Sequence, residues 1–144
     1  MLKSLFRQWL NSTHKLFSMQ ITERDITMDA FIEEEFVPFT EPPFGATLQK
    51  RDFIKRGMKH CVVLDISGRL VDPKCKELFM HVKRLIEKGE QMIVLNIEAV
   101  NTVDRSGVGS LVSCYVSIIN SGGALLLANP TRKFQDYFKC MRFL

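Results

Sequence analysis

Residues 92–97 read MIVLNI and residues 124–128 read ALLLA, and these two runs with the stretch between them decide the fold. Both runs are short and apolar at nearly every position, which is typical of strands buried on both faces of a sheet. Residues 105–120 place apolar side chains at helical spacing and end at Ser121-Gly122-Gly123. A strand, a helix and a second strand in this order predict a β-α-β crossover in an α/β sheet.

The same scheme occurs immediately upstream. Residues 61–66, CVVLDI, are closed by Ser67-Gly68 and predict another strand. Asp72-Pro73 predicts a helix start, with Asp72 as the N-cap and the proline in the first turn, where its missing N–H costs nothing. An apolar face then runs from Cys75 to Ile86, and Gly89 ends the helix.

Two further elements complete the predicted domain. Residues 47–54, followed by a turn at Lys55-Arg56-Gly57, are expected to form the preceding strand of a hairpin. Asn129-Pro130-Thr131 is expected to open a short helix with Phe134, Phe138 and Met141 on one side.

The residues ahead of this regular region differ in character. Pro38, Pro42 and Pro43 cluster there, and no glycine occurs before Gly45, so a boundary is expected near residue 45. Residues 1–45 are therefore expected to be an N-terminal extension and residues 46–144 the domain. Residues 2–10 have the spacing of a short amphipathic helix, and contact of residues 1–20 with a membrane is one of its possible roles.

Composition narrows the class of partner. The chain has 144 residues, a formal net charge of +4 and a sequence pI near 9.0, which makes nucleic acid or a membrane surface the first partners to consider. Its basic residues are interleaved with Glu and Asp, so a solvated surface is favoured over a nucleic-acid groove. No stretch reaches the ~20 apolar residues of a membrane span, no secretory signal is visible, and the four cysteines are scattered. These features indicate a cytoplasmic protein with reduced thiols.

The segment VDRSGVG at residues 103–109 joins a predicted strand to a predicted helix. Asp104 is placed as the N-cap, which puts Ser106 in the first turn of the helix. The helix start carries partial positive charge that would stabilise a phosphate on Ser106, and Arg105 adds a cation. Gly107 and Gly109 remove side chains and would let another surface approach. This edge, at the carboxyl ends of the strands, is the usual binding crevice of an α/β sheet.

Two enzymatic interpretations of this turn fail on its residues. A nucleotide-binding loop needs G-x-G-x-x-G or G-x-x-x-x-G-K-[ST], but residue 112 is Val and no Lys follows the glycines. A nucleophile elbow needs G-x-S-x-G, but Asp104 and Val108 occupy the glycine positions. A small α/β hydrolase using Ser106 stays as an alternative, although no histidine is tied to that serine by sequence context. No metal or cofactor site is expected.

Several segments together resemble a STAS domain, the fold of bacterial anti-sigma factor antagonists. The resemblance is carried by Val63–Leu70 with its Ser-Gly-Arg-Leu ending, by Ile93–Ile97, by Val103–Gly109, by Gly122-Gly123 and by Asn129–Thr131. It implies a mixed β-sheet with helices packed on one face, here lacking the closing C-terminal element that the family normally adds.

The resemblance also implies a function. Ser106 matches the serine that an anti-sigma factor with serine kinase activity phosphorylates, and a serine phosphatase reverses the modification. The unphosphorylated protein would bind the anti-sigma factor and free a sigma factor, regulating transcription without touching nucleic acid and without being an enzyme. The implied partner-binding residues are Asp72, Asp104, Arg105, Gly107, Val108 and Gly109. The alternative is a STAS scaffold subunit of a transporter or stress-signalling complex, with no phospho-switch.

Overall fold

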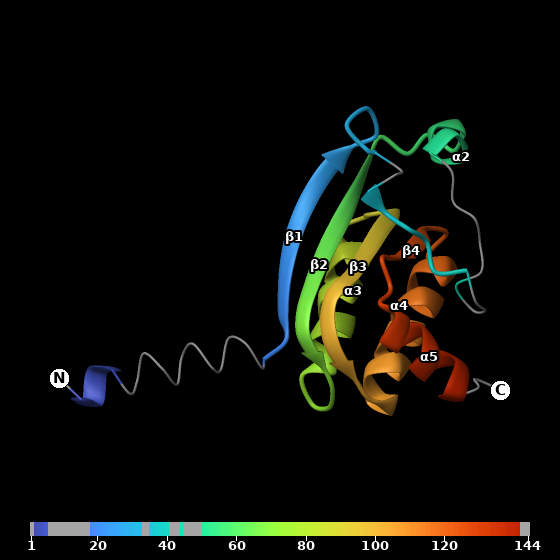
Figure 1. Cartoon of the computed structure of the whole chain (residues 1–144). Helices are drawn as coiled ribbons and strands as arrows, with labels where there is room; N and C mark the ends of the chain where they lie inside the picture. The colour runs from blue at the N-terminus through green and yellow to red at the C-terminus, as the bar shows by residue number, and fades with distance from the viewer. Residues whose placement is uncertain (1, 6–17, 33–34, 41–43, 45–49, 142–144) are drawn as a thin grey trace.

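The structure, a computed structural model, describes residues 2–5, 18–32, 35–40, 44 and 50–141. Its strands are β1 (Gln20–Thr27), β2 (His60–Leu70), β3 (Met92–Val103) and β4 (Ala124–Ala128), and its helices are α2 (Lys50–Lys55), α3 (Cys75–Glu87), α4 (Arg105–Asn120) and α5 (Arg132–Met141). Helices α3, α4 and α5 lie together on one side of a single sheet (Figure 1).

The sheet has four strands in the order β1-β2-β3-β4. Strand β1 is antiparallel to β2, whereas β2, β3 and β4 are parallel to one another. Helix α3 connects β2 to β3 and α4 connects β3 to β4, so both parallel pairs are joined by the predicted crossovers. The α/β class and the mixed sheet with helices on one face are confirmed.

Two hydrophobic cores explain why the strands are apolar at successive positions. In β2, Val62, Leu64 and Ile66 contribute to the core beneath the helices, while Cys61 and Val63 contribute to a second core on the opposite face. All five side chains are at most 2% exposed. Successive residues of a strand point to opposite faces, so a strand between two cores needs an unbroken apolar run.

The second core is covered by the connection between β1 and β2. Phe31 and Phe36 stack with their ring centroids 5.5 Å apart, and Phe53 of α2 is 1% exposed. The prediction of a hairpin strand at residues 47–54 is wrong, because α2 occupies Lys50–Lys55 and β1 is the antiparallel neighbour of β2. Phe53 anchors this short helix over the sheet, a contact that local sequence pattern does not reveal.

The same connection also covers the far edge of the sheet. Pro38 forms an antiparallel bridge with Ala128 of β4, and the Phe39 N–H donates to the Leu127 carbonyl at 2.8 Å. The Asn129 N–H donates to the Val37 carbonyl at 2.7 Å. Residues 37–39 therefore satisfy backbone groups that β4 would otherwise leave unpaired.

The expected boundary near residue 45 does not separate two packing units. Residues 20–27 are a strand of the sheet, and Phe39 and Phe44 belong to the core beneath the helices. Residues 2–5 of the expected amphipathic helix are helical, with Leu2 86% exposed. The remainder of that expected helix, residues 6–10, lies outside the described residues.

The observed start of α4 agrees with the sequence-based prediction, and the observed start of α3 differs from it. Asp104 caps α4 as predicted, and the Thr131 hydroxyl caps α5 by accepting from the Phe134 N–H at 3.1 Å. Helix α3 instead begins at Cys75, with Lys74 at the N-cap position and no side-chain cap. Asp72 does not cap α3, because the Cys75 N–H donates to the Val71 carbonyl at 2.9 Å and the Lys76 N–H to the Pro73 carbonyl at 3.3 Å.

Candidate functional site

The Asp104 side chain organises the turn between β3 and α4. One carboxylate oxygen accepts from the Gly107 N–H at 2.7 Å, and the other accepts from the Asp72 N–H at 3.1 Å. The Asp104 N–H itself donates to the Leu70 carbonyl at 3.4 Å. Asp104 thus ties the turn after β3 to the loop after β2, at the carboxyl ends of two adjacent parallel strands.

Ser106 lies in the first turn of α4 and is exposed, as is the adjacent Arg105. Its hydroxyl makes no hydrogen bond with any residue that the structure describes. The first turn of a helix has backbone N–H groups without intrahelical partners and carries partial positive charge. An anionic group added to Ser106 would therefore sit in a favourable field, with Arg105 beside it.

Two of the predicted contact residues are buried inside the chain. Val108 is fully buried in the core beneath the helices. Gly107 is buried too, and a Cβ atom on it would lie 2.0 Å from the Leu70 carbonyl oxygen. The space left by the missing side chain of Gly107 is filled by the chain's own β2 strand, so this glycine permits a close internal approach.

The other predicted residues lie at the surface of this edge. A Cβ atom on Gly109 would meet nothing within 4 Å, so that position is open. Asp72 is exposed, and its N–H bond to Asp104 holds it beside the turn. The site surface, defined as Asp72, Arg105, Ser106 and Gly109, thus combines the loop after β2 with the start of α4.

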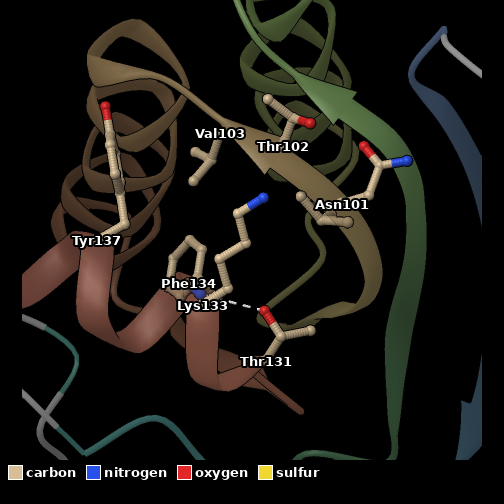
Figure 2. Close-up of a pocket in the computed structure, with 8 residues that line it drawn as sticks. Asn101, Thr102, Val103, Thr131, Lys133, Phe134 and Tyr137 are labelled. Carbon is tan, nitrogen blue, oxygen red and sulfur yellow. Dashed lines mark hydrogen bonds between the residues drawn. The ribbon is translucent and has the colours of Figure 1, made fainter.

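A cavity of about 220 Å³ adjoins this turn, between the end of β3 and the start of α5 (Figure 2). Its lining residues are Val100, Asn101, Thr102, Val103, Thr131, Lys133, Phe134 and Tyr137. Sequence reasoning missed it, because the cavity depends on how α5 packs against a strand some thirty residues earlier. Asn129-Pro130-Thr131, which predicted the start of α5, was its only local signal.

Sequence reasoning also missed a row of polar contacts across the sheet. The Arg24 guanidinium donates to Asp65 at 2.9 Å, and the Asn96 amide donates to the same carboxylate at 2.8 Å. The hydrogen bond to Asp65 raises the pKa of Arg24. The Asn129 amide donates to the Asn96 side-chain oxygen at 3.1 Å. Each of these polar side chains is partnered, which indicates a role in strand alignment.

The described histidines pair with glutamates and not with Ser106, and the thiols of Cys61 and Cys114 are buried. His60 pairs with Glu90 at 2.7 Å, and His81 pairs with Glu23 at 3.2 Å. Burial raises the pKa of the Cys61 thiol to about 11 and that of Cys114 to about 12, so neither is a reactive thiolate near neutral pH. Within the described residues no three His, Cys, Asp or Glu side chains are grouped to hold a metal ion.

Comparison with known proteins bears on this site. The family model described as STAS domain matches residues 52–144. Comparison with curated proteins gives no match. Within the part of the chain that the structure describes, no helix has the length and apolar character needed to cross a membrane.

Several solved structures are similar to this chain, among them the three that follow. The Bacillus cell fate determinant SpoIIAA in its phosphorylated form is 23% identical, with a TM-score of 0.48 over 56% of this chain and 74% of its own. The anti-sigma factor antagonist SpoIIAA in its unphosphorylated form is 24% identical, with a TM-score of 0.48 over 55% of this chain and 73% of its own. The murine anion transporter Slc26a9 is 11% identical, with a TM-score of 0.55 over 92% of this chain and 20% of its own.

Proposed function

Because the chain belongs to the STAS-domain family, we propose that it is a cytoplasmic anti-sigma factor antagonist whose partner binding is switched off by phosphorylation of Ser106. The partner is an anti-sigma factor with serine kinase activity, and a serine phosphatase reverses the modification. The protein acts as substrate and binder, is not an enzyme, and regulates sigma-factor-dependent transcription without contacting nucleic acid.

The observation that carries this proposal is the state of Ser106. Its hydroxyl is exposed and without a hydrogen bond to any described residue, so a kinase reaches it without unfolding α4. The start of α4 is held in place by the two hydrogen bonds that Asp104 accepts, from the Gly107 and Asp72 N–H groups. A fixed backbone with a free hydroxyl supports a modification site, whereas a serine that closed the turn itself would not.

The switch follows from the charge of the phosphate. A phosphoserine carries about −1.5 to −2 charges at pH 7. In the free protein the start of α4 and the Arg105 cation stabilise that charge while water solvates it. In a complex the phosphate has to be desolvated, which costs several kcal/mol unless the partner supplies matching cations. A loss of about 3 kcal/mol corresponds to roughly a hundredfold weaker binding.

A STAS scaffold subunit without a phospho-switch is the second candidate. Leu2 and Leu5 are 86% and 62% exposed on the helical turn ahead of β1, and such side chains favour attachment to another surface. In that case the protein would co-purify with a membrane assembly through residues 1–20, and substitutions at Ser106 would leave the attachment unchanged.

Phosphate mapping tests the modification. The protein is incubated with ATP and the serine kinase encoded beside its gene, and phosphopeptides are identified by mass spectrometry. We expect phosphate at Ser106 and none at Ser113, which is exposed on the same helix and serves as the internal control. Absence of phosphate from Ser106 would refute the proposal.

Binding measurements test the switch itself. Ser106→Ala is expected to bind the anti-sigma factor as tightly as the parent, and Ser106→Asp at least tenfold more weakly. Ser113→Asp is the matched control and is expected to bind like the parent. Equal affinity of the parent, Ser106→Ala and Ser106→Asp would count against a charge-controlled switch.

A further inference from the structure

The cavity beside the site surface is mostly apolar. Among its lining residues, Val100 and Phe134 are buried, and Val103 and Tyr137 are half-buried. The Thr131 hydroxyl accepts from the Phe134 N–H at 3.1 Å, so it is already used as the cap of α5. The cavity therefore offers an occupant apolar contact more than hydrogen bonds.

One charged residue lines the cavity. Lys133 extends from the first turn of α5 across the opening toward the end of β3 (Figure 2). Its ammonium group makes no ion pair or hydrogen bond with the residues that the structure describes. Because Lys133 is positively charged, an acidic group beside the apolar occupant would complement it.

The cavity and the site surface are close to each other along the chain. Val103 lines the cavity, and Ser106 follows it by three residues, so their Cα atoms are at most about 11 Å apart. A standard protein interface buries roughly 800 Å² on each partner, a patch much wider than this separation. An interface of that size centred on Ser106 is wide enough to include the residues that line the cavity.

The volume of the cavity indicates the size of its occupant. Pockets for drug-sized ligands and cofactors measure roughly 300–1,000 Å³, and this one is about 220 Å³. It is too small for a nucleotide and suits a single large side chain. Large side chains inserted into such pockets are typical energetic hot spots of protein interfaces.

We propose that this cavity receives one bulky apolar side chain, Phe, Leu or Met, from the protein that binds around Ser106, and that an acidic residue beside it pairs with Lys133. The inference rests on the proposed function, because it assumes a partner at the site surface. It assigns to that partner an apolar residue next to an acid, and it assigns to Lys133 a part in recognition.

Two substitutions at one position separate the apolar and the charged parts of this contact. Lys133→Trp fills the cavity with the chain's own ring, and Lys133→Glu leaves it open and reverses the charge. Lys139→Trp and Lys139→Glu are the matched controls, since Lys139 is exposed on the same helix and does not line the cavity. Thermal unfolding is measured for all four variants to establish that each one folds.

Affinity for the anti-sigma factor is measured by titration calorimetry, with Ser106→Asp in the same series. We expect both Lys133 variants to bind at least tenfold more weakly and both Lys139 variants to bind like the parent. Parental affinity of either Lys133 variant overturns the inference. Parental affinity of Ser106→Asp overturns the phospho-switch instead, so the two failures are distinguishable.

A second measurement needs no partner protein. N-acetyl-Phe-Glu-amide is titrated into the ¹⁵N-labelled full chain, with N-acetyl-Phe-Lys-amide as the charge control. We expect millimolar binding of the acidic dipeptide, seen as saturable shifts of the Val103, Lys133 and Phe134 amide signals, and at least tenfold weaker binding in Lys133→Trp. Equal shifts with both dipeptides, or none with either, overturn the inference.

Discussion

Gly107→Ala perturbs the contact between the start of α4 and the end of β2. The added Cβ atom would lie 2.0 Å from the Leu70 carbonyl oxygen, 2.9 Å from Val103 Cγ2 and 3.0 Å from the Leu70 carbonyl carbon. Relief by movement is restricted, because the Leu70 carbonyl accepts from the Asp104 N–H and the Gly107 N–H donates to the Asp104 carboxylate. The helix start and the strand end must separate, and these bonds lengthen.

The expected cost combines two opposing contributions. Overpacking a filled site costs about 1–3 kcal/mol, and the upper end applies at Gly107 because the nearest atoms belong to the backbone. Replacing glycine by alanine within a helix returns about 1 kcal/mol. The net expectation is a loss of about 2 kcal/mol in the free energy of unfolding, or a fall of roughly 4–8 °C in Tm for a chain of this size.

Gly109→Ala is the matched control for this prediction. It places the same methyl group on the same helix two residues later, where nothing lies within 4 Å of it. We therefore expect a gain of about 0.5–1 kcal/mol from the reduced conformational freedom of the unfolded chain. Urea unfolding followed by circular dichroism measures both variants, with equal m-values as the check on two-state behaviour. The close contact at Gly107 is refuted if Gly107→Ala is as stable as Gly109→Ala.

Three further outcomes are expected. Asp104→Ala removes a helix cap and the tie to the neighbouring loop, so urea unfolding should show a loss of about 2 kcal/mol, of which Asp104→Asn should recover part. Burial raises the pKa of Cys61 to about 11 and that of Cys114 to about 12 from the ordinary 9.0, so on raising the pH the unfolded chain releases these protons before the folded chain does. The free energy of unfolding should therefore fall above pH 9 by on the order of 1 kcal/mol per thiol per pH unit. In Cys114→Ala this fall should be smaller. Asn129→Ala removes the side-chain bonds to the Val37 N–H and the Glu35 carbonyl, so hydrogen exchange of the Phe39 amide should accelerate at least tenfold while the core amides of β3 stay protected.

The parts of the fold that follow from local sequence were predicted correctly. Strands β2, β3 and β4 are apolar on both faces, and the periodic faces of α3 and α4 meet them in one core. The Asp104 cap was also predictable, because aspartate is a preferred N-cap residue and Asp104 directly precedes the helical run. In each case the determining residues lie within a few positions of one another.

The parts that failed depend on residues far apart in sequence. Phe31, Phe36 and Phe53 have no helical or strand period, since each is positioned by the second core and not by its neighbours. Asp72 has the right residue type for a helix cap, yet its loop is held by Asp104, which lies 32 positions later. The first N–H groups of α3 donate to the Val71 and Pro73 carbonyls, a backbone course that the residue type at position 72 does not reveal.

The structure differs most from the sequence-based prediction at the connection between β1 and β2. A strand with an exposed edge offers its backbone to any other strand, and β4 is short and buried on both faces. Its edge is covered by residues 37–39, which are held by the four hydrogen bonds that Asn129 makes to Glu35, Val37 and Asn96. Asn129 adopts a positive φ of 57°, a conformation that asparagine tolerates better than most residues, and it lies two positions before the Thr131 cap of α5. Since α5 forms one wall of the cavity, the segment that covers β4 and the helix that carries Lys133 are fixed by adjacent residues. Loosening the covering segment should therefore also change the cavity beside Ser106.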